Sequence, residues 1–275
     1  MRIGDSDHPL IMGILNVTPD SFSDGGRFAT VDLAVAHAKQ MLEEGADILD
    51  VGGESTRPGS TLVPADEQRR RVVPVIRAIR EQLGEDPILS VDTRLADVAE
   101  AALDAGANMI NDVAAALNSV DMLALAAERD VPLVLMHMQG TPQTMQENPV
   151  YGDVAEEVCA FLSERAAAAI AAGISHQNIV LDPGIGFGKS RQHNIDLLAA
   201  LPRLAGLGFP VLLGTSRKRF MGSLCGESEP VRLLGATCAT TTFGVFAGVR
   251  VFRVHDVRPN RQAADVAWAL LPKKP

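Results

Sequence analysis

One pattern constrains the fold of this sequence more than any other: a short apolar run recurs eight times, each time followed by a segment with helical spacing. The runs cover residues 10–15, 48–49, 87–91, 109–110, 132–136, 179–181, 210–214 and 249–252. Runs of this length, bounded by glycine, proline and small polar residues, indicate buried strands. Strands that alternate with helices indicate a parallel sheet, and eight such units predict a closed (β/α)8 barrel. We therefore expect an α/β fold, the TIM barrel, with residues 1–275 as a single domain.

The segments between the runs are expected to form the helices. We predict helices from residue 30 or 32 to 44, over 65–82, up to the residue before Gly106, and over 121–129, 153–172 and 194–204, with further helical segments to about 246 and a last helix that contains Ala263 and Leu270. An open doubly wound sheet is the alternative fold, and it requires a GxGxxG turn that opens the first helix. The glycines at 184, 186 and 188 have a different spacing and come late in the chain, so the barrel is favoured.

The composition excludes several classes of partner. Hydrophobic residues make up 47% of the chain and charged residues 21%, which is ordinary for a globular protein with a sizeable core. The net charge of −9 argues against a nucleic acid or an anionic membrane as partner.

Cys159, Cys225 and Cys238 form no CxxC pair, and their odd number fits a reducing cytoplasm. We expect neither a signal peptide nor a membrane span, because no apolar segment of the required kind is present.

The stretch 182–189, Asp-Pro-Gly-Ile-Gly-Phe-Gly-Lys, directly follows the sixth apolar run. It places a carboxylate at the end of a strand and then a turn in which the backbone can approach a ligand closely, because glycine has no Cβ. An aspartate before Pro-Gly is also a common turn former, and a single case fits either interpretation. The functional interpretation gains weight because apolar runs that end in a polar group recur along the chain.

In a (β/α)8 barrel the C-terminal ends of the strands converge on one mouth, where active sites lie. Polar side chains stand at or next to these ends: Asn16, Asp50, Asp92, Asn111, His137, Asp182, Ser216 with Lys218, and Arg253 with His255. Polar residues end many strands in any protein, so part of this set needs no function. The carboxylates and the amide nevertheless suit a planar heterocycle with several N–H groups, because ionised carboxylates only accept hydrogen bonds.

Positive charge near the same mouth predicts a substrate with an anionic part. Arg253 and His255 follow the eighth run, where barrels of this class commonly bind phosphate, and arginine binds phosphate oxygens in a bidentate manner or stacks on a ring. A buried neutral imidazole is the alternative for His255 and also for His137. Residues 216–218 are expected to open a helix whose free N–H groups favour a carboxylate. Judged by its charge alone, Lys218 is better explained as a solvated surface residue.

Two further features bear on this site. No HExxH, CxxC or clustered His/Asp pattern points to a tightly bound transition metal, whereas Mg²⁺ held mainly by substrate phosphate oxygens needs no motif of its own. Residues 17–29 form a long polar loop that contains Phe22, and long loops in compact domains are often lids.

The sequence segments around the predicted strand ends closely resemble the signatures of dihydropteroate synthases. Residues 12–26 (MGILNVTPDSFSDGG) resemble the opening signature of that family, and residues 50–59 (DVGGESTRPG) resemble the second, with Val51 where isoleucine is more usual. The resemblance continues, in the family's order, through 90–94, 110–113, 135–140, 182–189, 214–218 and 253–257. Thr215 and Ala114 depart from the family pattern, which affects the expected substrate contacts but not the type of reaction.

The resemblance implies a transferase of folate biosynthesis that joins 6-hydroxymethyl-7,8-dihydropterin pyrophosphate to 4-aminobenzoate and releases pyrophosphate and 7,8-dihydropteroate. It implies that the pterin is contacted by Asp92, Asn111, Asp182 and Lys218, while Arg253 stacks on the pterin ring and binds pyrophosphate together with His255. Asn16 is implied as a ligand of Mg²⁺, Gly214 as part of the substrate site and Phe22 as part of a lid loop. The aminobenzoate side is implied to be formed by Thr56, Arg57, Pro58, Phe187 and Ser216. Asp92, Lys218, Arg253 and His255 are expected to act directly in catalysis. The family further implies a homodimer, with its interface away from the barrel mouth, and inhibition by sulfonamides.

For the reaction we hypothesise an SN1-like path, in which Asp92 stabilises the cationic pterin left by departing pyrophosphate. The loops around Asn16 and Arg57 are then expected to close and exclude water. Two alternatives are a pterin-binding methyltransferase domain on the same barrel and a catalytically silent pterin-binding paralogue. The first would lack the Ser-Thr-Arg-Pro-Gly loop and the site at 216–218, and the intact polar set at the mouth argues against the second.

Overall fold

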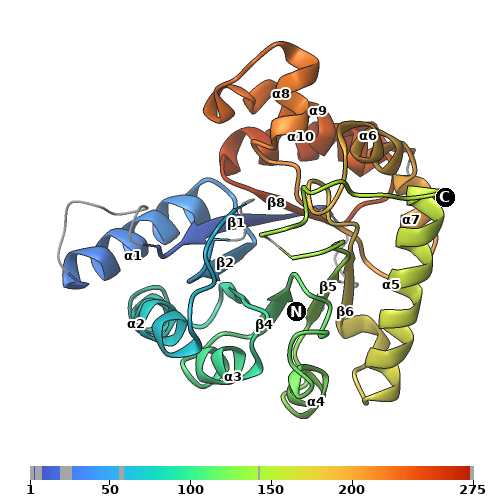
Figure 1. Ribbon diagram of the computed structural model, residues 1–275. Coiled ribbons are helices and arrows are strands. Elements are labelled where there is room, and N and C mark those ends of the chain that lie inside the picture. The colour runs from blue at the N-terminus through green and yellow to red at the C-terminus, as the bar shows by residue number, and fades with distance from the viewer. Residues whose placement is uncertain (1–2, 4–7, 19–26, 56–58, 142, 273–275) are drawn as a thin grey trace.

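A ring of parallel strands forms the centre of the computed structural model, and helices surround it (Figure 1). The structure describes residues 3, 8–18, 27–55, 59–141 and 143–272. The strands are β1 (Leu10–Asn16), β2 (Ile48–Gly52), β3 (Ile88–Asp92), β4 (Met109–Asp112), β5 (Leu133–Met136), β6 (Ile179–Asp182), β7 (Leu212–Leu213) and β8 (Val251–Val254). The helices are α1 (Arg27–Glu43), α2 (Ala65–Leu83), α3 (Ala96–Asp104), α4 (Met122–Glu128), α5 (Val154–Ala171), α6 (Arg191–Ala199), α7 (Leu201–Ala205), α8 (Arg219–Cys225), α9 (Leu234–Phe246) and α10 (Val257–Leu270), with the short 3₁₀ turns η3 (His176–Asn178) and η4 (Pro230–Arg232).

The strands follow one another around the barrel in the order β6-β5-β4-β3-β2-β1-β8-β7. All the strand pairings along this order are parallel. The remaining gap, between β6 and β7, is bridged in parallel by Leu181 and Val211, and the N–H of Leu181 donates to the carbonyl of Pro210 at 2.9 Å. This arrangement confirms the predicted (β/α)8 barrel.

Several element boundaries differ from those predicted. The helix expected over 194–204 is two helices, α6 and α7, because Pro202 at the start of α7 has no N–H to continue the ladder. The eighth strand begins at Val251 instead of residue 249, since the backbone at Val249 still bonds to Gly244 in α9. The first helix begins at Arg27, earlier than the capping residues suggested.

Alternation along each strand gives the barrel wall two different faces. In β2, Leu49 and Val51 belong to the large core between the wall and the helices, whereas Ile48 belongs to a separate apolar cluster inside the barrel. That inner cluster contains Ile3, Leu10, Met12, Ile48, Met109, Val134, Val180, Leu212 and Val251, all fully buried. Because side chains point to opposite faces with a period of two, the next inward positions after this cluster include Asp50, Asn111, Asp182 and Arg253. An apolar floor therefore supports a polar layer near the C-terminal ends of the strands.

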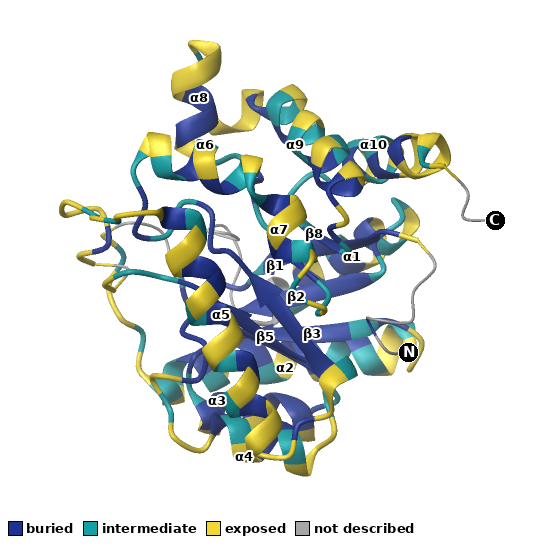
Figure 2. Cartoon of the chain, turned by 90° about the vertical axis from the view of Figure 1, so that its right-hand side faces the viewer, coloured by how far each residue is buried: buried dark blue, intermediate teal, exposed yellow. Residues whose placement is uncertain are grey.

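The strands and the helix faces that cover them are buried, and the exposed positions lie on the outer helix faces and in loops (Figure 2). None of the helices in the described part of the chain combines the length and the apolar character that a membrane crossing requires.

Candidate active site

A guanidinium group between two carboxylates occupies the centre of the polar layer. The Arg253 side chain donates from Nε to Oδ2 of Asp50 and from Nη2 to Oδ2 of Asp92, each at 2.6 Å. These residues come from β8, β2 and β3, so the barrel brings together groups that are 161 and 203 positions apart in sequence. Burial raises the pKa of Asp92 to about 7; the Arg253 charge opposes this shift, and the nearby Asp50 charge adds to it.

The amide of Asn111 extends the same network onto β4. Its Nδ2 donates to Oδ2 of Asp50 at 3.0 Å, and the backbones of Asn111 and Asp92 are register partners. A carboxylate only accepts hydrogen bonds, so the contact with Asp50 determines which end of the amide is the nitrogen. The Oδ1 atom of Asn111 is therefore the end available as an acceptor for a ligand.

Asp182 and Lys218 provide a second pair of opposite charges at the mouth. Burial raises the pKa of Asp182 against the opposing charge of Lys218, and the carboxylate accepts the N–H of Gly184 at 2.7 Å. The Lys218 amine donates to the carbonyl of Ile185 and lies 4.6 Å from the centre of the Phe187 ring. Burial lowers the pKa of Lys218 to about 8, although Asp182 favours the charged form. The interpretation of Lys218 as a solvated surface residue is therefore wrong.

The loop after β6 is tied to the loop after β5 by a buried lysine. The Nζ atom of Lys189 lies 2.9 Å from Nδ1 of His137 and 3.0 Å from the carbonyl oxygens of both Gly184 and Phe187. Burial, together with the Lys189 charge, lowers the pKa of His137 to about 3, so this imidazole stays neutral. The sequence alternative of a buried neutral histidine at His137 is correct. Lys189 is the last residue of the glycine-rich stretch, but nothing in the sequence indicated that its amine is buried against His137 and the loop carbonyl oxygens.

The loops after β7 and β8 meet through Ser216 and His255. The Ser216 hydroxyl accepts the backbone N–H of His255 at 3.1 Å and lies 3.0 Å from its Nδ1. Next to this contact, Arg217 forms a two-bond ion pair with Asp256, at 3.0 and 2.7 Å, while its φ of 59° lies in the left-handed region. Residues 216–218 lead into a helix as predicted: Lys218 is the N-cap of α8, and the seven-residue helix begins at Arg219.

The remaining predicted residues fall into two groups. Asn16 lies at the end of β1. Its register partner is Gly52 on β2, which in turn pairs with Asp92 on β3. A Cβ placed on Gly214 would lie 3.9 Å from the Arg253 side chain and 4.0 Å from the Lys218 amine, so this glycine also belongs to the mouth. Phe22, Thr56, Arg57 and Pro58 lie outside the described residues.

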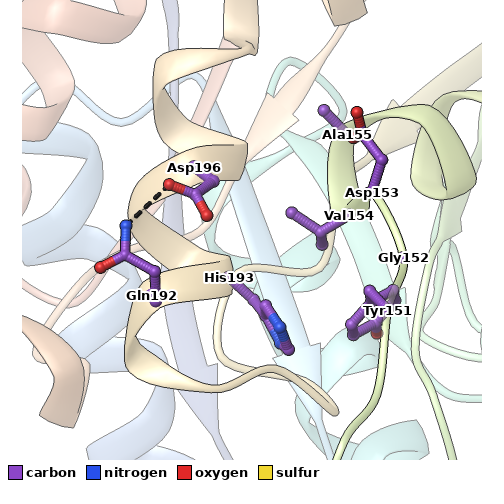
Figure 3. A pocket seen from close by; sticks show the side chains of 8 residues that line it. All are labelled: Tyr151, Gly152, Asp153, Val154, Ala155, Gln192, His193 and Asp196. Atoms are coloured by element: carbon purple, nitrogen blue, oxygen red, sulfur yellow. Dashed lines mark hydrogen bonds between the residues drawn. The ribbon is translucent and has the colours of Figure 1, made fainter.

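A cavity of about 430 Å³ lies between the starts of α5 and α6, and none of the polar residues described above lines it (Figure 3). Its lining includes Asp153 and Asp196 but neither lysine nor arginine, so it lacks the cation that a pyrophosphate requires. Tyr151 forms part of its wall and donates to the carbonyl of Gly188 at 2.7 Å. The cavity therefore lies behind the loop that carries the site and is not the site itself.

Comparisons with known proteins agree with this geometry. A family model described as pterin binding enzyme matches residues 12–255. The dihydropteroate synthase of Streptococcus pyogenes serotype M6 is 48% identical over 275 residues, which cover 98% of this chain and 100% of that protein. The structure of Xanthomonas albilineans dihydropteroate synthase with 4-aminobenzoic acid is 49% identical, with a TM-score of 0.89 and coverage of 97% and 95% of the two chains. The Yersinia pestis dihydropteroate synthase complex with a sulfonamide drug is 42% identical, with a TM-score of 0.88 and coverage of 95% and 94%. The chain therefore belongs to the dihydropteroate synthase family of pterin-binding transferases.

Proposed function

We propose that the barrel mouth of this chain binds 6-hydroxymethyl-7,8-dihydropterin pyrophosphate and 4-aminobenzoate together and joins them to form 7,8-dihydropteroate and pyrophosphate. The observation that carries this proposal is the convergence of Arg253, Asp92, Asn111, Asp182 and Lys218 from five different strand ends. A single substrate with a polar heterocycle and an anionic tail accounts for both the acceptors and the cations in this set.

The pterin is assigned to the acceptor side of the layer. Asp92, Asp182 and the Oδ1 end of Asn111 would accept hydrogen bonds from the ring N–H groups, and Lys218 would donate to a ring acceptor. These groups are buried or enclosed, which strengthens hydrogen bonds to a ligand that excludes water. The Arg253 guanidinium would stack on the ring and, with His255, bind the pyrophosphate.

The side-chain oxygen of Asn16 fits a role as a protein ligand of Mg²⁺. Within the described residues, no three His, Cys, Asp or Glu side chains form a cluster that could enclose a metal ion. Asn16 does offer a neutral oxygen donor at the end of β1, and Mg²⁺ commonly takes one or two protein oxygens together with substrate phosphates. When bound there, Mg²⁺ would neutralise part of the pyrophosphate charge.

The proposed reaction begins with cleavage of the C–O bond, whose electron pair leaves with the pyrophosphate. Arg253 and His255 stabilise the departing anion, while Asp92 stabilises the pterin cation. The 4-aminobenzoate nitrogen then forms the C–N bond and releases one proton. Phe187 and Ser216 would contact the aminobenzoate, and the loops that carry Asn16 and Arg57 would exclude water from the cation. A positional-isotope experiment without 4-aminobenzoate tests this order, since absence of bridge-to-nonbridge oxygen exchange would contradict the dissociative step.

The proposed enzyme is a homodimer of the cytoplasm. The packed helices α9 and α10 leave Phe243, Phe246, Val266 and Leu270 exposed, and these positions are spaced by three on one helix and by four on the other. An exposed group of large apolar side chains is typical of a protein interface.

A turnover assay with the two substrates and Mg²⁺ is the direct test of the proposed function. Formation of dihydropteroate that depends on both substrates supports it. A folded protein that binds pterin pyrophosphate but forms no product would instead support the silent paralogue. Competition between a sulfonamide and 4-aminobenzoate is expected, and non-competitive binding would contradict the assignment of the second substrate's site.

A further inference from the structure

Asp50 is the most deeply buried charged group of the polar layer. It lies in the middle of β2, between its register partners Ile14 and Ser90, and its exposed fraction is 0%. A carboxylate in this position is costly unless other groups compensate its lost hydration. Its location below the mouth also keeps it from direct contact with bulk water, so it does not serve as a surface charge.

The two oxygens of Asp50 have different surroundings. Oδ2 accepts both from Nε of Arg253, at 2.6 Å, and from Nδ2 of Asn111, at 3.0 Å. Oδ1 is buried without a hydrogen-bond partner in the part of the chain that the structure describes, and so is the hydroxyl of Ser90. One oxygen atom therefore fixes two side chains that come from opposite sides of β2 around the barrel.

Each of those two contacts fixes an orientation that a ligand would sense. The bond from Nε, together with the bond from Nη2 to Asp92, determines the plane of the Arg253 guanidinium. The bond from Nδ2 turns the acceptor end of Asn111 away from Asp50. Without Asp50, both groups could rotate, and the amide could present a donor where an acceptor is needed.

We propose that Asp50 is a positioning residue for the reaction proposed above: it holds the Arg253 guanidinium and the Asn111 amide in the orientation that receives the pterin substrate. This role rests on the proposed function, but it adds a residue to which the resemblance assigned no contact. It also gives a reason why a buried carboxylate is kept at this position, where an apolar residue would continue the floor of the barrel.

The test compares Asp50→Asn and Asp50→Ala with Ser90→Ala as the matched control. Ser90 is the register partner of Asp50, is equally buried, and loses a hydroxyl that has no partner among the described residues. In Asp50→Ala both bonds are lost, and kcat/KM for the pterin substrate is expected to fall about 100-fold. In Asp50→Asn the amide oxygen can still accept both bonds but carries no charge, so the expected fall is about tenfold. Ser90→Ala should retain the wild-type value, and KM for 4-aminobenzoate should stay within about twofold in all three variants.

A second readout needs no substrate. Hydrogen exchange of the Asn111 side-chain amide, followed by NMR, should be slow in the wild type, Ser90→Ala and Asp50→Asn and fast in Asp50→Ala. A wild type without turnover would therefore refute the proposed function while this readout still decides whether Asp50 orients Asn111. A folded Asp50→Ala with wild-type kcat/KM would overturn the proposal, as would a loss in Ser90→Ala equal to that in Asp50→Ala. If Asp50→Ala does not fold, an unchanged kcat/KM in Asp50→Asn overturns it.

Discussion

The amine of Lys189 lies 2.9 Å from Nδ1 of His137, and both side chains are buried. The same amine also contacts the carbonyl oxygens of Gly184 and Phe187, so the loop after β6 is closed around it. This contact joins two of the loops that build the barrel mouth, and it depends on a single buried lysine.

Replacement of Lys189 by methionine should lower the free energy of unfolding by about 3 kcal/mol, because it leaves several buried acceptors without a donor. Urea unfolding measures this loss. Lys39→Met is the control. The Lys39 amine is exposed and its ion pair with Glu43 is long, at 3.9 Å, so the free energy of unfolding should change by less than about 0.5 kcal/mol. The pKa of His137 should also rise from about 3 in Lys189→Met, since one of its two lowering causes is removed. An unchanged His137 titration by NMR would contradict the close contact between the Lys189 amine and the His137 imidazole.

The activity of the free enzyme should depend on pH through Asp92 and Lys218. Asp92, with a pKa of about 7, must be ionised to stabilise a cation, so kcat/KM should fall as pH drops below 7. Lys218, with a pKa of about 8, must be protonated to carry a positive charge, so kcat/KM should also fall above pH 8. A profile of kcat/KM for the pterin substrate, measured from acid to alkaline pH, should therefore be bell-shaped with a narrow maximum. If Lys218→Met keeps the alkaline decline, the group responsible is not Lys218.

Asp92→Asn separates binding of the leaving group from stabilisation of the cation. The amide retains the size of the carboxylate but not its charge, so kcat should fall about 100-fold or more. Pyrophosphate affinity, measured by calorimetry, should change far less, because Arg253 and His255 remain. An unchanged kcat removes Asp92 from the proposed role.

Gly184→Ala tests the close approach of the two mouth loops. Gly184 has a φ of 66°, and a Cβ there would come within 1.8 Å of the carbonyl oxygen of His137. The backbone must shift to relieve this clash, so we expect a loss of about 3 kcal/mol or more in unfolding experiments. Gly235→Ala is the matched control in α9, where an added Cβ meets nothing within 4 Å and should stabilise the helix by up to about 1 kcal/mol. Equal stability of the two variants would show that the loops do not approach each other this closely.

The proposed dimer face can be tested with a charge. The wild type should have twice the 29.2 kDa mass of one chain in light scattering, and Phe246→Glu should convert it to monomers, because a buried unpaired carboxylate opposes association. Val120→Glu is the control, since Val120 is 91% exposed and precedes α4, outside the α9–α10 face. A monomeric wild type would refute the dimer, and a dimeric Phe246→Glu would place the interface elsewhere.

The fold followed from local patterns. Eight apolar runs, each ended by a polar residue or glycine and followed by a helical segment, were sufficient to predict the barrel, because strand and helix periodicity is a property of neighbouring residues. The mouth residues Asp92, Asn111, Asp182 and Arg253 were predicted for the same reason. In a parallel barrel, the end of a strand is also a position in space.

Contacts between those ends required the tertiary structure. No local pattern shows that Arg253 bonds to Asp50, 203 positions away, or that Lys189 turns inward while Lys218 is enclosed near Asp182. Burial and neighbouring charge determine these relationships, and both arise only when distant strands assemble. The sequence by itself therefore determined which polar groups reach the mouth, whereas the tertiary structure decided which of them bond to one another and how deeply each is buried.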